Sequence, residues 1–538
     1  MTSDTTQERN RGFWENTGSR KGLLSWILST DHKRIGLLYL YSIMSFFIVG
    51  LLLGLSMKLE LIAPGKTIMG PQTYNGVFTL HGIIMVFLIV IPGLPAIFGN
   101  FMLPIMIGAK DVAFPRLNLL SWYFYIAGAA IVLISQFTAG GPPDTGWTFY
   151  APYSFRTSTN VLPAVLGAFV LGFSSILTGL NFIVTIHRMR APGMGWFKMP
   201  LFPWALYSTA WIQLLATPIV GITLLMIVAE RVLKIGFFDP SLGGDPVLYQ
   251  HLFWIYSHPA VYIMILPAMG AISEIIPTFA QKSIFGYKAI VASTLLIAFV
   301  GYFVWGHHMF TSGMSGTALY AFSLLTFFVA IPSAIKVFNW VSTLYKGSIN
   351  VQTPFYWALS FMFVFMIGGL SGLVLGSVAT DMHVHDTAFV VAHFHFIIFG
   401  GVGFAFFGAI HYWFPKIFGR MYDSGWANTG WLLFFIGFLA LYLPMFYLGL
   451  EGMPRRYYDY VPEFHGPNIL STIGSWILAT GFFIILANLV RSAKHGPIAE
   501  MNPWNGKTLE WTVPSPPPLE NFEEIPEITK GPYDYTKE

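Results

Sequence analysis

Twelve stretches of predominantly apolar residues, each long enough to cross a lipid bilayer, dominate the sequence. A spanning helix needs about 20 such residues, because hydrocarbon leaves every backbone polar group to be satisfied within the helix. Only 10% of the 538 residues are charged, against roughly 25% in ordinary soluble domains. This composition excludes a soluble enzyme or a disordered chain, and the net charge of +4 gives no reason to expect a nucleic-acid partner. We therefore predict an all-α membrane protein with spans at 36–57, 76–103, 116–138, 160–187, 204–230, 251–276, 285–309, 317–342, 355–378, 387–415, 427–449 and 470–491.

The distribution of lysine and arginine predicts the orientation of these spans. If the N-terminus is cytoplasmic, 21 of the 29 basic residues lie on the cytoplasmic side and seven on the other side, as the positive-inside rule requires. We expect a cytoplasmic segment at 1–35, a membrane domain at 36–491 and a polar, proline-rich cytoplasmic tail at 492–538.

Histidine and cysteine usage narrows the chemistry. The chain has no cysteine, which excludes disulfides, thiolate metal sites, iron–sulfur clusters and covalent heme attachment through CxxCH. It has 14 histidines, and several fall inside predicted spans. Ionisable residues in a membrane are costly, so they are candidates for function. A single such histidine could equally be a helix-packing hydrogen-bond partner. The spacing of several histidines is what distinguishes a functional site from packing.

Two of these histidines, His393 and His395, lie on one predicted helix in VVAHFHFIIFGG. A helix turns about 100° per residue, so their rings point about 200° apart. One ion cannot readily bind both, but two cofactors flanking the helix could take one each. His81 opens a glycine-flanked apolar run, TLHGIIMVF, and could serve as an axial heme ligand opposite another histidine.

Three further histidines have the spacing of a single metal site. His307 and His308 are adjacent in VWGHHMF, and neighbouring helical residues diverge by about 100°, which still lets both reach one ion. His258 lies in YSHPAVY, four residues before Tyr262, so the imidazole and the phenol share a helix face. Three imidazoles suit copper or zinc. The apolar surroundings without cysteine favour redox copper.

These motifs together resemble the catalytic subunit, subunit I, of the heme–copper oxygen reductases, the cytochrome c oxidase family. The resemblance covers roughly 25–525, through STDHKRIGLLYL, HGIIMVF, IGAKDVAFPRLN, GWTFYAP, HPAVYIMILP, WGHHMF, IPSAIKVFNW, HDTAFVVAHFHF, GMPRRY and EWTVPSPPP. It implies four-electron reduction of O2 to water with electrons from cytochrome c, coupled to proton pumping. It also implies two hemes, expected to be heme A, a copper ion called CuB, and a bacterial inner-membrane location.

The resemblance assigns roles to the histidines and to one tyrosine. Tyr262 would be cross-linked to His258 and would donate an electron and a proton when the O–O bond breaks. The ligand sets that the family implies are His81 and His395 for the low-spin heme, His393 for the high-spin heme, and His258, His307 and His308 for CuB.

Residues on the outer side match further family positions. His385 and Asp386 would bind Mg²⁺ with help from subunit II, although a loop hydrogen-bond pair is the alternative. Arg455 and Arg456 would pair with heme propionates, or act as interfacial anchors. Trp147 matches a tryptophan near the electron entry route, where a simple interfacial tryptophan is the alternative. Expected partners are subunit III and a subunit II that carries a second copper site, CuA, because the thiolates CuA needs are absent here.

Polar residues match two proton routes of the family. Lys336 lies inside a span and would belong to a route towards Tyr262 with Ser273 and Ser333; snorkelling of Lys336 is the alternative. Asp111 matches the entrance of a second route, and Asn100 and Asn118 match asparagines above that entrance.

Two features of the sequence depart from the commonest family pattern. Ala260 stands two residues after His258, where a glutamate is usual, and Tyr256 and Ser257 precede that histidine. This resembles an A-type subgroup in which a Tyr–Ser pair replaces the glutamate, so we expect pumping to be retained. Lys58 stands near a family arginine that contacts the low-spin heme, and lysine lacks a planar bidentate donor. Glu60 resembles a ligand of a peripheral Ca²⁺ or Na⁺ ion.

Three alternative functions compete with this interpretation. A quinol oxidase of the same family would carry charged residues on its first helices, whereas SFFIVGLLLGL at 45–55 has none. A nitric oxide reductase lacks the Tyr262 and Lys336 pair. A twelve-helix secondary transporter fits the composition and span count, but it often shows repeated halves and has no use for these histidine motifs together.

Overall fold

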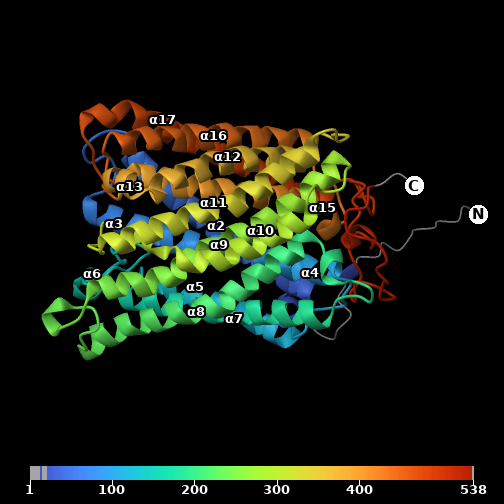
Figure 1. Ribbon diagram of the computed structural model, residues 1–538, viewed down its shortest axis with the longest axis horizontal. Coiled ribbons are helices and arrows are strands. Elements are labelled where there is room, and N and C mark those ends of the chain that lie inside the picture. The colour runs from blue at the N-terminus through green and yellow to red at the C-terminus, as the bar shows by residue number, and fades with distance from the viewer. Residues whose placement is uncertain (1–11, 15–20, 536–538) are drawn as a thin grey trace, which may run out of the picture.

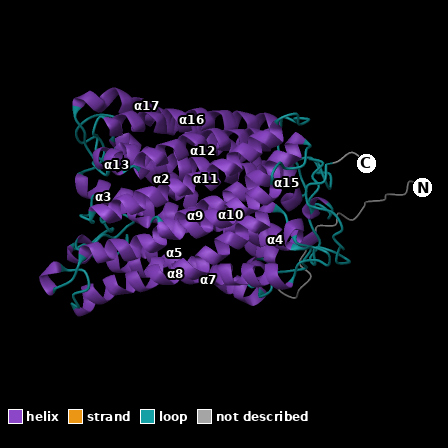
Figure 2. Ribbon diagram, in the orientation of Figure 1, coloured by secondary structure: helices purple, strands orange, loops and turns teal. Residues whose placement is uncertain are grey.

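The structure, a computed structural model, describes residues 12–14 and 21–535. This part of the chain is all-α: it has no β-strand, only two isolated β-bridges, and its helices run side by side in one bundle (Figure 1 and Figure 2). Twelve helical segments are long and apolar enough to cross a membrane. The predicted fold class and number of spans are therefore confirmed.

Several spans join more than one helical element. The twelve segments are α2 (His32–Glu60); α3 (Pro71–Ile83) continued to Met106 by η2 (Ile84–Val90), η3 (Gly93–Gly99) and α4 (Asn100–Met106); α5 (Pro115–Ile134); α7 (Val161–Arg188); α8 (Leu201–Leu233); α9 (Pro246–Ala280); α10 (Tyr287–Val300) continued to Met309 by η6 (Gly301–Phe303) and η7 (Trp305–Met309); α11 (Gly316–Leu344); α12 (Thr353–Gly376); α14 (Ala388–Phe394) continued by η8 (His395–Gly403) and α15 (Phe404–Phe418); α16 (Ser424–Leu450); and η9 (Pro462–Phe464) continued by α17 (His465–His495).

The ends of some spans differ from the predicted bounds. Helix α2 begins at His32 rather than 36, because Asp31 accepts hydrogen bonds from the backbone N–H groups of Lys33 and Arg34 and so caps the helix. Helix α5 ends at Ile134 rather than 138, ahead of the glycine- and proline-rich loop. Helix α17 continues to His495 rather than 491.

The predicted regular α-helical geometry is wrong at two histidine motifs. His307 and His308 lie on η7, a 3₁₀ helix, whose tighter winding turns about 120° per residue. His395 begins η8, a π-helix, so the span widens directly after His393. π-Turns inside helices occur frequently at functional sites, and both irregular segments line the cavity described below.

Helix α9 is the most buried of the twelve spans and α11 the least. The described chain ends, with the segment 499–535 shown in red, lie at the end of the bundle opposite α3 and α13 (Val378–Val384) (Figure 1). This C-terminal segment is packed into the protein, since Trp511, Phe522 and Tyr533 are buried. It therefore forms part of the fold at that end of the bundle.

Candidate metal and cofactor site

One large cavity of about 1100 Å³ collects all six histidines that the sequence singled out. Pockets for one drug-sized ligand occupy about 300–1,000 Å³, so this cavity is at least as large as the largest of them. Its walls come from α2, α3, α9, α11, α12, α14 and the loop after α16. Residues far apart in sequence thus surround one space inside the membrane domain.

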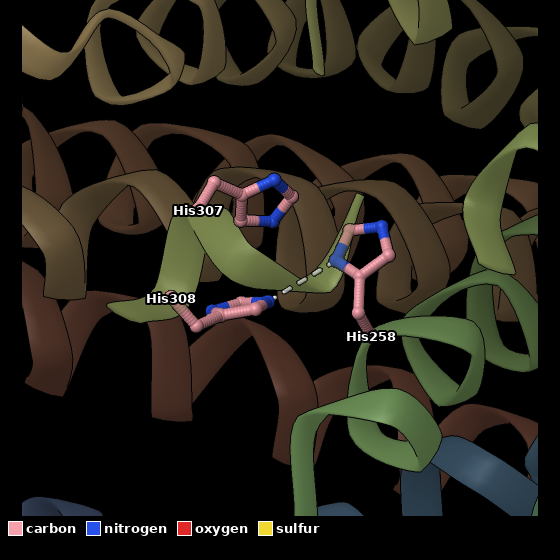
Figure 3. Close-up of side chains that lie close together, drawn as sticks. All are labelled: His258, His307 and His308. Carbon is pink, nitrogen blue, oxygen red and sulfur yellow. Dashed lines mark hydrogen bonds between the residues drawn. The ribbon is translucent and has the colours of Figure 1, made fainter. Parts of the chain in front are cut away.

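Three of the histidines converge within this cavity. His258 comes from α9, and His307 and His308 come from η7; one ring nitrogen from each lies within 4.8 Å of the others. His258 Nδ1 and His308 Nε2 are 3.1 Å apart (Figure 3). Imidazole nitrogens about 2.0–2.1 Å from a tetrahedral ion lie slightly farther apart than this, so the three rings fit one ion after a small adjustment.

Neighbouring side chains fix the orientation of these three rings. The ring of His308 stacks on Trp254, with centroids 3.8 Å apart and planes 9° apart. Nδ1 of His307 lies 2.9 Å from the hydroxyl of Thr326. Such outer partners set the tautomer and direction of a metal-binding imidazole. Thr326 has no motif of its own on α11, so sequence reasoning missed it.

Tyr262 lies beside His258 as the four-residue spacing predicts. The two ring centroids are 4.8 Å apart, with the planes at 70°. The ring of Tyr262 also packs against Gly301, where a Cβ atom would lie 2.5 Å from Tyr262 Cδ2. Only glycine leaves room for the phenol at this point.

The other three histidines each use Nδ1 for a hydrogen bond and so leave Nε2 available for a metal. Nδ1 of His81 lies 2.8 Å from the carbonyl oxygen of Gly50, and Nδ1 of His395 lies 2.8 Å from that of Val391. Nδ1 of His393 is 3.0 Å from the Ser371 hydroxyl and 3.1 Å from the Gly368 carbonyl oxygen. A ring that donates through Nδ1 presents a lone pair on Nε2, as metal-bound histidines do.

The glycine-rich part of α12 explains how His393 reaches its position. A Cβ atom on Gly372 would lie 3.0 Å from Cε1 of His393, so the ring packs directly on the helix backbone. The run IGGLSGLVLG at 367–376 was the available signal for this contact and for Ser371, and sequence reasoning did not use it.

A charged cluster lies at the end of the cavity next to α13. His385 Nδ1 lies 2.9 Å from Asp381 Oδ2, and His385 Nε2 lies 3.9 Å from Asp386 Oδ2. Burial disfavours the imidazolium of His385, but the hydrogen bond and charge of Asp381 outweigh it and raise the pKa of His385. Asp381 was not predicted; it lies one helical turn before His385.

The two predicted arginines also lie at this end. Arg455 Nη1 is 3.6 Å from Asp386 Oδ1, while Arg455 Nε is buried without a hydrogen-bond partner among the described residues. Arg456 lines the cavity beside it. A buried donor without a partner is costly, and a carboxylate bound in the cavity would satisfy it.

Trp147 lines the same cavity and belongs to a run of aromatic rings. Its ring centroid is 5.9 Å from that of Trp254, which in turn stacks on His308. The tryptophan is therefore in contact with the three-histidine cluster through one intermediate ring.

The residues of the predicted Lys336 route lie along α9 and α11. Lys336 is fully buried, and Ser333, one turn away, lines the cavity together with Tyr262. Trp340, one turn in the other direction, donates through Nε1 to the Ser273 hydroxyl at 3.0 Å. The structure thus brings the four residues into one region, between the cavity and the end of the bundle that carries the C-terminal segment.

The residues of the second predicted route start in the loop after α4. Burial raises the pKa of Asp111 to about 7. Asn100 Oδ1 and both amide atoms of Asn118 are buried without hydrogen-bond partners among the described residues. Such atoms in a polar space are typical partners of internal water, which a proton route requires.

The remaining predicted positions lie near the histidine cluster or at the end of the bundle next to α13. Tyr256 is buried, and Ser257 Oγ is buried without a described partner. Lys58 lines the cavity. Glu60 accepts hydrogen bonds from the backbone N–H groups of 67–69 through both carboxylate oxygens. These bonds hold the loop at 67–69 against the end of α2.

The fold and this cavity together define a multi-pass membrane protein with a polyhistidine cofactor site. The family model described as "Cytochrome C and Quinol oxidase polypeptide I" matches residues 34–477. Cytochrome c oxidase subunit 1 of Thermostichus vulcanus is 45% identical over 94% of this chain and 92% of its own length. The corresponding subunit of Bacillus subtilis is 40% identical over 98% of this chain and 84% of its own. A solved heme–copper terminal oxidase dimer has the same fold, with a TM-score of 0.70 at 23% identity over 87% of this chain and 85% of that one.

The chain belongs to the cytochrome c oxidase subunit 1 family and is the catalytic subunit of a terminal oxidase. Hemes and copper are its cofactors, and it assembles with other oxidase subunits and with cytochrome c. The transporter and quinol oxidase interpretations are not favoured.

Proposed function

We propose that the six cavity histidines hold two hemes and CuB, with His81 and His395 on the low-spin heme, His393 on the high-spin heme, and His258, His307 and His308 on CuB. The observation that supports this assignment is that the six imidazole rings form two groups of three. Three leave Nε2 available after anchoring Nδ1, and three converge on one point. The chemistry that the bound groups supply is the transfer of electrons to O2.

The protein's own side chains then hold and move protons. Tyr262, beside His258, donates the phenolic proton towards the space between the copper ligands and His393. We include the His258–Tyr262 cross-link in this proposal. Arg455 and Arg456 neutralise heme propionates, which the unpartnered Nε of Arg455 supports. Trp147 lies on the electron entry path, supported by its contact with Trp254.

We assign Mg²⁺ to His385 and Asp386. Neighbouring ligands about 2.1 Å from an octahedral ion lie about 3 Å apart, so His385 Nε2 and Asp386 Oδ2, which are 3.9 Å apart, would move closer together to hold the ion. Asp381 orients the imidazole from behind. A partner subunit completes this site, because Asp386 is largely exposed on the protein surface.

Protons enter by two routes from the cytoplasm. One comprises Lys336, Ser273, Ser333 and Tyr262; the other begins at Asp111 and passes Asn100 and Asn118. Tyr256 and Ser257 take the role of the glutamate that is usual at the position of Ala260, and they keep pumping possible, as in the A-type subgroup. A charge moved against 100 mV stores about 2.3 kcal/mol, so pumping conserves part of the redox energy.

The remaining assignments concern the assembled enzyme. We propose heme A in both heme positions, a CuA-bearing subunit II as electron entry, a subunit III, and a bacterial inner membrane with both termini cytoplasmic. Oxygen consumption by the purified complex tests the donor directly. Reduced cytochrome c is expected to support rapid turnover and a ubiquinol analogue is not; the reverse result would identify a quinol oxidase.

Replacing Ser371 with alanine is expected to weaken retention of the high-spin heme about ten-fold. Loss of an outer hydrogen-bond partner costs about 10- to 100-fold in affinity, and the Gly368 carbonyl oxygen still anchors His393, so the lower figure applies. Heme transfer to apomyoglobin measures it. The control is Ser360→Ala on the same helix, where the lost hydroxyl accepts from Trp431; equal heme loss in both variants would contradict a specific role for Ser371.

Asp111 is expected to keep its proton up to pH about 7, because burial raises the pKa of its carboxyl to that value, whereas an exposed aspartate ionises near pH about 4. The protonated fraction falls as pH rises through the folded value. Infrared titration of wild type against Asp111→Asn follows the carboxyl band that only the wild type has. A band that vanishes well below pH about 7 would contradict this prediction.

A further inference from the structure

A second cluster of buried ionisable groups lies outside the cavity, where the C-terminal segment packs against α9 and α15. Glu274 on α9, Glu510 on η10 (Leu509–Trp511) and Lys416 on α15 are 0–1% exposed. The two carboxyl groups are linked through packed residues: Phe202 donates its backbone N–H to Glu274, Trp413 donates Nε1 to Glu510, and the rings of Phe202 and Trp413 have centroids 5.0 Å apart. None of the three ionisable residues has a role in the site described above.

Geometry identifies the charge of Lys416. Its ammonium nitrogen lies 3.1 Å, 2.5 Å and 3.3 Å from the carbonyl oxygens of Met501, Val513 and Pro514. An ammonium has three N–H donors and no acceptor, so three carbonyl acceptors match the charged form. Lys416 therefore contributes one positive charge to the cluster.

The two carboxyl groups are incompletely hydrogen-bonded. Glu274 Oε1 accepts from Tyr533 Oη at 2.6 Å and from the backbone N–H of Phe202 at 2.8 Å. Glu510 Oε1 accepts a long bond from Trp413 Nε1, at 3.4 Å. The Oε2 atom of each carboxyl is buried without a hydrogen-bond partner among the described residues. Burial raises the pKa of Glu510.

Charge balance then decides the protonation of the pair. Two ionised carboxylates beside one ammonium would leave a net negative charge in a fully buried site, which is strongly unfavourable. One bound proton makes the cluster neutral. The other titratable groups that face the pair are Tyr287, Tyr412, Tyr533 and Tyr535, and neutral phenols do not change this count.

The position of the Glu274 and Glu510 pair indicates where this proton can be transferred. Glu274 directly follows Ser273 on α9, and Ser273 Oγ accepts from Trp340 on α11, one turn from Lys336. Tyr533, which donates to Glu274, and Glu510 itself belong to the C-terminal segment. The pair thus lies where α9 meets the C-terminal segment, at the end of the bundle that we propose to be cytoplasmic.

We propose that Glu274 and Glu510 share one proton and form the inlet that supplies the Lys336 route. The proton passes from cytoplasmic water to the carboxylate pair and then towards Lys336, with no other bond formed or broken. The second half of this proposal rests on the Lys336 route proposed above; the first half, the shared proton, does not.

Infrared spectra of the assembled oxidase test the shared proton. Wild type is expected to show one deuterium-sensitive infrared band from a protonated carboxyl. This band is expected to be lost in both Glu274→Gln and Glu510→Gln, because the glutamate that remains in each variant is ionised and balances the charge of Lys416. Tyr533→Phe is expected to shift this band. Glu230→Gln is the control and is expected to keep the band; Glu230 is a buried glutamate on α8 that accepts from the backbone N–H groups of Phe238 and Asp239. A different band lost in each variant, or no band lost, would overturn the shared proton.

Single-turnover reduction of the heme–copper centre tests the inlet. Both glutamine variants are expected to slow this step about 100-fold, the lower range for loss of a proton-transfer group, and the double variant no further than the slower single one. Lys336→Met is measured in parallel. If Lys336→Met is slow and both glutamine variants keep the wild-type rate, the inlet is overturned. If Lys336→Met itself keeps the wild-type rate, both the proposed Lys336 route and its inlet are overturned. The shared proton is then still decided by the infrared spectra.

Discussion

Replacing His307 with alanine is expected to abolish oxygen reduction while both hemes remain bound. Loss of an outer partner of a metal ligand already costs about 10- to 100-fold, so loss of a ligand that the cluster of three requires is expected to lower turnover by more than about 100-fold. The measurement is oxygen consumption with reduced cytochrome c, together with copper and heme content per complex.

The matched control for this variant is His251→Ala. His251 lies on α9 two turns before His258 and accepts from Trp305 Nε1 at 3.2 Å, outside the group that can hold a metal. It is expected to keep copper and to retain most activity. Full copper content in the His307 variant would contradict the assignment of CuB to His258, His307 and His308.

Replacing Lys336 with methionine is expected to slow turnover by about 100-fold, the lower range for loss of a positioned proton-transfer group. Methionine keeps the length and the apolar contacts of the lysine stem but removes the ammonium. Electron entry into the low-spin heme is expected to stay fast, and reduction of the high-spin heme to become slow, because only the latter step needs protons near Tyr262. Stopped-flow absorbance separates the two hemes.

Lys282→Met provides the comparison for this variant. Lys282 lies at the same end of the bundle, and its ammonium donates to the carbonyl oxygens of Ser342 and Tyr345 rather than facing the route. It is expected to leave both steps unchanged. Equal slowing of both hemes in Lys336→Met would point to a structural role for Lys336 instead of proton transfer.

The sequence predicted the fold well because membrane helices obey a strong constraint. Length and apolarity alone located all twelve spans, and errors arose only at their ends, where capping by Asp31 or a glycine-rich loop decides the boundary. The local geometry at the histidines was less predictable. A 3₁₀ helix at His307 and a π-helix at His395 depend on packing against neighbouring helices, which hydrophobic periodicity does not record.

Within the site, spacing and family resemblance named the residues that face the cavity but missed those that orient them. Thr326, Ser371 and Asp381 each hold a histidine Nδ1, yet serine, threonine and aspartate are common in sequences without such a role. The Glu274 and Glu510 pair was missed for another reason. Glu274 and Glu510 are 236 positions apart in the sequence, and only the folded C-terminal segment brings them together.

His393 and His395, two residues apart on one span, are expected to serve two different hemes. Reduced-minus-oxidised optical spectra of His393→Ala and His395→Ala, prepared in the assembled complex, test it most directly. His393→Ala is expected to lose only the high-spin heme signal and His395→Ala only the low-spin signal. Loss of the same heme signal from both variants would contradict it.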